Sequence, residues 1–129
     1  MTGSRRQVDA FTAAVLGLLV PGLGHFVLGR RHKAVLYFVL IVGTFLAGWF
    51  ISGRENVYFT SGRWHTLVQM GTGVITFAVG LPSEAAEPRH TVMHVFEIGT
   101  LYTMVAGLLN VLVVMDAALT GVRLRRAGP

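Results

Sequence analysis

Residues 34–51 read AVLYFVLIVGTFLAGWFI and contain no charged side chain. At ~1.5 Å per residue, a helix over this stretch would be about 27 Å long, which nearly matches the ~30 Å hydrocarbon core of a bilayer. Tyr37 and Trp49 stand near its two ends, where aromatic side chains favour the membrane interface. We therefore expect residues 33–52 to form a membrane-spanning helix.

The composition of the whole chain agrees with lipid as its solvent. Among its 129 residues, 53% are hydrophobic and 13% are charged, and the mean hydropathy is +0.61, whereas soluble domains have about 25% charged residues. We predict an all-α, polytopic membrane bundle of about four helices in one domain, 1–129, in a bacterial inner membrane. The absence of cysteine excludes disulfides, thiolate metal sites and cysteine nucleophiles.

The other helices are expected at about 10–20, 64–81 and 89–122. The first is apolar but is broken by a turn at Pro21, Gly22, Gly24 and Gly29, since proline and glycine interrupt helices. It is read as a retained short span or a re-entrant element, because no small-residue cleavage site for a signal peptide follows it. Such a turn at membrane depth needs cover from neighbouring helices.

Arginine and lysine cluster where the apolar stretches end, which gives the chain a net charge of +5. The expected membrane-interface residues are Arg30, Arg31, Lys33, Arg123, Arg125 and Arg126. Four spanning segments would place seven of the 11 basic residues inside, and re-entrant first and third segments would place eight inside. We keep four spanning helices and leave the orientation open. A basic groove with interleaved aromatics is absent, so nucleic acid is not an expected partner.

Small and polar residues recur on one face of the last helix and predict its packing surface. At 100° per residue, Gly99, Thr103, Ala106, Asn110, Val113 and Ala117 share this face. Asn110 is interpreted as bonding to another helix, with a ligand or ion contact as the alternative. The predicted helix-packing residues are Gly99, Thr103, Ala106, Gly107 and Asn110, together with Thr72, Thr76 and Gly80 of the third segment.

His90, His94 and Glu97 are spaced so that a helix would bring them within about 60° of arc, where they could bind one divalent cation. The alternatives are a proton-linked role, or a structural or partner contact. A haem between His94 and either His25 or His65 is a further possibility. We expect no cofactor.

No set of residues predicts a reaction. Glu97 and Asp116 would lie roughly 28 Å apart along a helix, which is too far for a carboxylate pair. Gly22-Leu23-Gly24 lacks the strand and lysine of a phosphate-binding loop. An intramembrane enzyme is ranked last, because His25, His94, Glu97 and Asp116 are dispersed, so we predict that the chain is not an enzyme.

Two stretches carry a family resemblance. Residues 20–31, VPGLGHFVLGRR, resemble the glycine-aromatic turn of the two-transmembrane-helix domain family and its bacterial relatives. EIGTLY at 97–102, AGLLN at 106–110 and DA at 116–117 resemble the last helix of small bacterial membrane proteins of uncharacterised function that share this turn. Family members usually have tyrosine where Val27 stands, and the eukaryotic aspartate-arginine-phenylalanine triplet is missing. The resemblance implies a membrane hairpin and no activity.

These patterns favour a non-enzymatic role. We expect an accessory or scaffold subunit of a larger inner-membrane complex, respiratory or photosynthetic, whose partners are the lipid bilayer and other membrane subunits or copies of itself. One alternative is a small oligomeric transporter or channel-like protein, in which Asn110, Gln69 and threonines line a polar path. The other is a metal- or haem-binding membrane protein.

Overall fold

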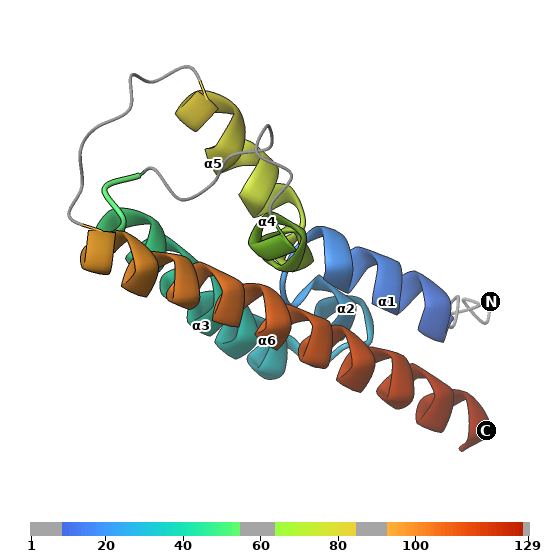
Figure 1. Ribbon diagram of the computed structural model, residues 1–129. Helices are drawn as coiled ribbons and strands as arrows, with labels where there is room; N and C mark the ends of the chain where they lie inside the picture. The colour runs from blue at the N-terminus through green and yellow to red at the C-terminus, as the bar shows by residue number, and fades with distance from the viewer. Residues whose placement is uncertain (1–8, 55–63, 85–92, 128–129) are drawn as a thin grey trace.

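The computed structural model describes residues 9–54, 64–84 and 93–127, and the regular structure in these ranges is entirely helical. The chain forms α1 (Ala10–Leu19), α2 (Leu23–Val27), α3 (Arg31–Ile51), α4 (Trp64–Gln69), the short 3-10 helix η1 (Met70–Thr72), α5 (Val74–Glu84) and α6 (Met93–Arg126). Figure 1 shows α3 and α6 as a long pair, with the shorter helices along its sides.

Two of the helices, α3 and α6, are long and apolar enough to cross a membrane. The most apolar 18-residue windows within 31–51 and 97–126 have mean hydropathies of 2.3 and 2.0. Only 22% of the first window and 28% of the second is buried. The core helix of a soluble protein would bury much more of its surface. This combination of high hydropathy and low burial favours a membrane protein.

The two long helices run antiparallel and touch most closely where glycines meet. A Cβ at Gly48 of α3 would lie 2.6 Å from the Gly99 carbonyl oxygen of α6, and a Cβ at Gly99 would lie 2.5 Å from the Gly48 carbonyl oxygen. Small residues bring helix backbones into contact in this way. At the other end of the pair, Lys33 of α3 lies beside Asp116 of α6.

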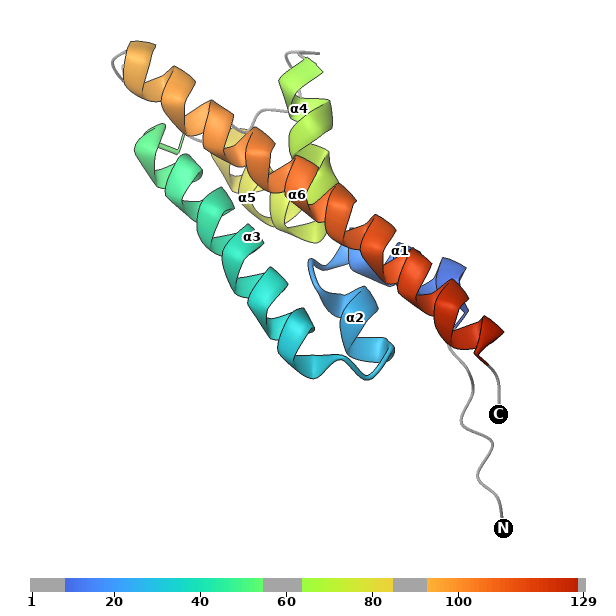
Figure 2. The same ribbon diagram turned by 90° about the horizontal axis from the view of Figure 1, so that it is seen from below.

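The helices α1 and α2 form a hairpin that covers only the last part of α6. Ala10 contacts Gly121, and seven residues later a Cβ at Gly17 would lie 3.3 Å from Val114, so α1 runs antiparallel to α6. The chain then turns at Gly22, whose φ of 82° suits glycine. Figure 2 shows α2 leading back toward the beginning of α3.

Residues 64–81 do not form the single helix that the sequence analysis predicted. The chain forms α4, leaves it through η1, and continues as α5 after Gly73, which has a φ of 66°. A Cβ at Gly73 would overlap the Leu18 carbonyl oxygen near the end of α1. The apolar pattern of the segment did not reveal this break, because the break depends on a contact with a distant helix.

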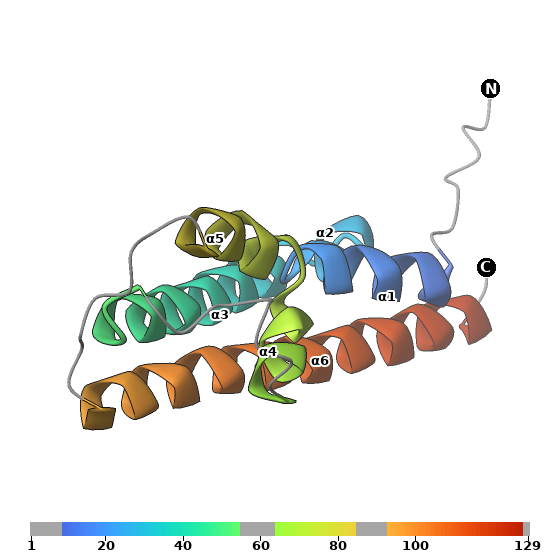
Figure 3. The ribbon, with the colours of Figure 1, turned by 45° about the horizontal axis from the view of Figure 1, so that its top comes forward.

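The short helices therefore occupy different parts of the α3–α6 pair. In Figures 1 and 3, α1 and α2 lie along the part that contains the end of α6, while α5 points toward the end of α3 and the beginning of α6. The hairpin turn after α1 and the break between α4 and α5 meet near the middle. Ile41, Phe45, Ala106 and Val113 form the buried apolar core there.

Candidate functional site

The meeting point of the short helices is held by Asn110, which is fully buried on α6. Its Nδ2 donates to the Gly71 carbonyl oxygen at 2.7 Å and to the Gly17 carbonyl oxygen at 3.2 Å. One side chain thus binds η1 and α1 to the long helix. Irregular backbone in an apolar surrounding needs such partners, because its carbonyls lack helical ones.

A second group of buried polar side chains joins α4 and η1 to α6. Gln69 Nε2 donates to Thr103 Oγ1 at 2.6 Å, and the Thr103 hydroxyl donates to the Thr100 carbonyl oxygen at 2.9 Å. The hydroxyls of Thr72 and Thr76 both donate to the Gln69 carbonyl oxygen. These contacts satisfy backbone and side-chain groups at the helix break, which is a structural role.

The residues predicted for helix packing are all buried, and several make close contacts. A Cβ at Gly107 would overlap the Val68 carbonyl oxygen, and Thr103 and Asn110 make the hydrogen bonds described above. The Thr72 and Thr76 hydroxyls lie against each other and do not line one straight helix face, because the helix breaks at Gly73. The full predicted set is Gly99, Thr103, Ala106, Gly107, Asn110, Thr72, Thr76 and Gly80.

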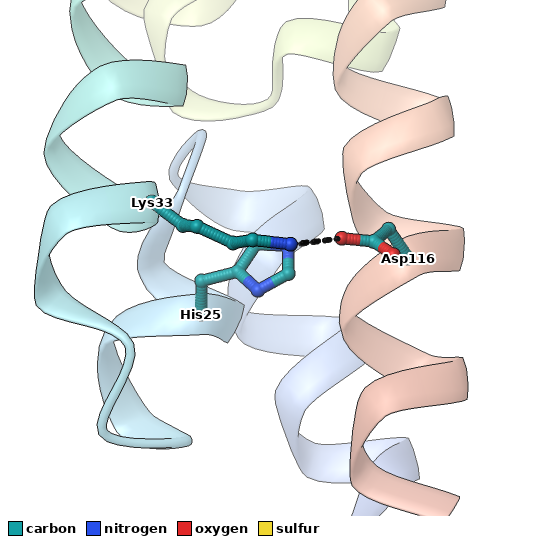
Figure 4. A network of polar contacts seen from close by, with 3 residues as sticks. All are labelled: His25, Lys33 and Asp116. Atoms are coloured by element: carbon teal, nitrogen blue, oxygen red, sulfur yellow. Dashed lines mark ion pairs between the residues drawn. The ribbon is translucent and has the colours of Figure 1, made fainter. Parts of the chain in front are cut away.

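A cluster of ionisable residues lies where the beginning of α3 meets the last part of α6 (Figure 4). His25 of α2 is fully buried, and its Nε2 lies 3.2 Å from Asp116 Oδ2 of α6. Lys33 Nζ of α3 lies 3.7 Å from the same oxygen, and the side chains of Lys33 and Asp116 are 45% and 46% exposed. Three elements therefore contribute one ionisable group each.

The surroundings of this cluster decide what it can do. The Tyr37 ring packs against the His25 imidazole with centroids 5.1 Å apart. A cavity of about 350 Å³ opens beside Asp116 between α3 and α6, and it is lined by Tyr37, Leu40, Ile41, Leu109, Leu112, Val113 and Asp116. The Lys33 ammonium forms an ion pair with the Asp116 carboxylate, and the His25 imidazole lies against the same oxygen. Stabilising the α2–α3–α6 junction is the simplest role of the cluster.

The predicted metal site receives no structural support. His90 lies outside the described residues, as does the side chain of His94, and Glu97 is exposed on α6. Within the described ranges no group of three or more histidines and carboxylates could hold a metal ion. The metal site therefore stays a prediction.

The prediction of a haem held between His25 and His94 is wrong. His25 lies beside Asp116, whereas the His94 backbone is at the other end of α6, 22 residues away, which is about 33 Å. The alternative through His65 falls on a side chain outside the described residues.

The turn residues and basic residues fall at defined places. Pro21 and Gly22 connect α1 to α2, a Cβ at Gly24 would overlap the Ala13 carbonyl oxygen, and Gly29 precedes α3 with a φ of 80°. The basic residues at the beginning of α3 and the end of α6 lie at the same end of the molecule, since these helices are antiparallel. They are Arg30, Arg31, Lys33, Arg123, Arg125 and Arg126, and all are exposed.

The approach of His25 to Asp116 was not predicted from the sequence, because 91 positions separate the two residues and they looked too dispersed to assemble. A signal was present: an aspartate in an otherwise apolar helix needs a partner of opposite charge or a hydrogen-bond donor. His25 and Lys33 are two of the basic residues in or just after the glycine turn, and both approach the Asp116 carboxylate.

A family model now places the chain among related sequences. The model for the DUF6677 family, a family of unknown function, matches residues 12–128. The chain belongs to this family. The match begins within α1 and extends beyond the end of α6, so it includes the Asn110 contacts and the His25–Asp116 cluster. No curated protein and no solved structure matches the chain.

Proposed function

We propose that this DUF6677 protein is a multi-pass inner-membrane protein without catalytic activity, which serves as an accessory or scaffold subunit of a larger membrane assembly. The observation that carries the proposal is the distribution of polar and apolar side chains between the interior and the surface of the protein. Asn110, Gln69 and Thr103 are used for contacts within the chain. The large side chains on the outer faces of α3 and α6 are apolar and exposed.

This surface suits a protein whose binding partners lie in the bilayer. Leu101, Leu108 and Leu112 are 54–62% exposed along α6, and Val35 and Val39 are each 60% exposed on α3. Such faces bind lipid or other apolar helices. Because these exposed apolar side chains lie on the helices proposed to cross the bilayer, contacts within the bilayer would supply most of any partner's binding.

Purification from native membranes tests the proposal. A tagged chain should be recovered in mild detergent with a stoichiometric protein partner. A photo-crosslinking residue at the exposed position Leu112 should form adducts with that partner, whereas one at the buried position Ala106 should not. Recovery of a lone monomer, without protein adducts from Leu112, would count against an accessory subunit.

We also propose that only α3 and α6 cross the bilayer fully, and that the α1–α2 hairpin and the α4–α5 segment enter it from opposite sides. The meeting of Gly17 and Gly71 at Asn110 supports this arrangement. It puts eight of the 11 basic residues on the side of the α3 beginning, which the positive-inside rule makes the cytoplasmic side. Four full spans would place seven of the 11 basic residues on one side of the membrane and four on the other.

Single cysteines distinguish the two topologies, because the natural chain has none. With two full spans, Arg30→Cys and Ala127→Cys should react with a membrane-impermeant thiol reagent from the same side, and Arg54→Cys from the opposite side. With four full spans, Arg54→Cys and Ala127→Cys should share a side instead. The labelling pattern therefore decides between them without any knowledge of a partner.

The transporter or channel alternative has one observation in its favour. Broken helices that meet inside a membrane are typical of transport proteins. The polar residues at this meeting point, however, contact one another and the backbone, and the neighbouring cavity has mainly apolar walls. A solute flux in liposomes that contain only this chain would favour transport over a scaffold role.

A further inference from the structure

The outer face of α3 has two shallow apolar grooves near its beginning. The first lies between α3 and the α1–α2 turn, has a volume of about 240 Å³, and is lined by Val20–Leu23, Phe26, Ala34, Val35 and Phe38. The second is lined by Arg31, His32, Val35, Leu36 and Val39. Val35 belongs to both grooves and forms the ridge between them.

Positive charge is placed where the two grooves begin. The Arg31 guanidinium lies over the Phe26 ring, 5.9 Å from its centroid, and Phe26 is a wall of the first groove. Arg31 itself lines the second groove together with His32. Packing over the Phe26 ring restricts the position of the Arg31 guanidinium. Because Arg31 also lines the second groove, one cation lies beside both grooves.

We propose that these grooves bind one diacyl anionic phospholipid, with its phosphate at Arg31 and one acyl chain on each side of Val35. The charge at the rim complements a phosphate, which arginine binds with two parallel hydrogen bonds. From Arg31 to Phe38 the helix rises about 10 Å, so the first groove follows the upper part of an acyl chain into the bilayer. The inference rests on the membrane location proposed above.

The shape favours a lipid over a protein helix. Two grooves that share Val35 and lie beside one cation match a headgroup with two chains, whereas a helix about 10 Å across would rest on the Val35 ridge and leave both grooves empty. Arg30, Lys33 and the basic last turn of α6 lie at the same end. They add to the attraction for an anionic leaflet and give no selectivity for this position.

The test is native mass spectrometry of the purified full-length chain in mixed micelles with phosphatidylglycerol and phosphatidylcholine. We expect one phosphatidylglycerol to be retained in preference to phosphatidylcholine. Arg31→Gln should weaken that retention about five-fold, which is the contribution of one arginine near an anionic lipid surface. Val35→Trp should also weaken it, because the indole would fill both grooves.

Matched variants make the result specific. Arg125→Gln removes the same charge from the exposed end of α6, so it should weaken retention less than Arg31→Gln does. Leu112→Trp places the same indole at an exposed position on α6 outside both grooves, so it should leave retention unchanged. Equal weakening by Arg125→Gln, or no preference between the two lipids, would overturn the proposal. Retention of a protein at Arg31 in place of a phospholipid would also overturn the proposal. Because the isolated chain is used, the outcome is independent of whether a partner subunit exists.

Discussion

Asn110 Nδ2 donates to the carbonyl oxygen of Gly17, which lies 93 residues earlier in the chain, over 3.2 Å. The same amide donates to Gly71, so one side chain closes the contact between three separate segments. A buried amide without partners in an apolar medium costs several kcal/mol. The bond therefore stabilises the positions of α1 and η1 against α6.

Replacement of Asn110 by leucine should destabilise the fold by about 1–3 kcal/mol, because the Gly17 and Gly71 carbonyls lose their donor. The free energy of unfolding can be measured by denaturant titration in mild detergent. Thr44→Val is the control, since the Thr44 hydroxyl bonds only the Leu40 carbonyl of its own helix. Equal effects of the two variants would show that Asn110 does not join the segments.

Gly48→Ala should cost about 1–3 kcal/mol of the free energy of unfolding, because the added methyl group would lie 2.6 Å from the Gly99 carbonyl oxygen and force α3 and α6 apart. Gly43→Ala is the matched control on the same helix, where nothing lies within 4 Å of the new Cβ. It should be neutral or slightly stabilising, as alanine favours helix. A crossing at Gly48 and Gly99 is contradicted if both substitutions are equally tolerated.

Gly73→Ala should destabilise the protein more than Gly29→Ala does. Both glycines have positive φ, so each alanine meets backbone strain, and the strain is larger at Gly73, whose φ of 66° and ψ of −129° lie outside the left-handed helical region. Only at Gly73 would the methyl group also overlap a neighbouring backbone, at the Leu18 carbonyl oxygen. Thermal unfolding of the two purified variants measures the difference, and a larger loss at Gly29 would refute the contact between Gly73 and α1.

Lys33 and Asp116 should be energetically coupled. In a double-mutant cycle with Lys33→Met and Asp116→Asn, we expect a coupling of about 0.2–1 kcal/mol, since both side chains are nearly half exposed. The same cycle with Glu97→Gln should give none, because Glu97 lies at the other end of α6. Coupling of Lys33 to Glu97 would contradict the antiparallel register of α3 and α6.

The local properties of the sequence determined much of this protein. An uncharged stretch at 34–51 and a long apolar stretch at about 89–122 predict two helices of membrane length, and the structure has α3 at Arg31–Ile51 and α6 at Met93–Arg126. The regular recurrence of Gly99, Thr103, Ala106 and Asn110 also pointed to one face of α6, and these residues are buried. Helix length and periodicity follow from the covalent chain, so they are readable without a partner.

Only the tertiary structure decided where the short helices break and which distant residues meet. The apolar composition of 64–81 is compatible with one straight helix, and its break at Gly73 follows from the approach of Leu18. The contact of His25 with Asp116 likewise depends on the turn at Gly22, which carries α2 back between α3 and α6. Hydropathy reports the preference of each residue for lipid, whereas contacts between distant segments are set by the packing of backbones against each other.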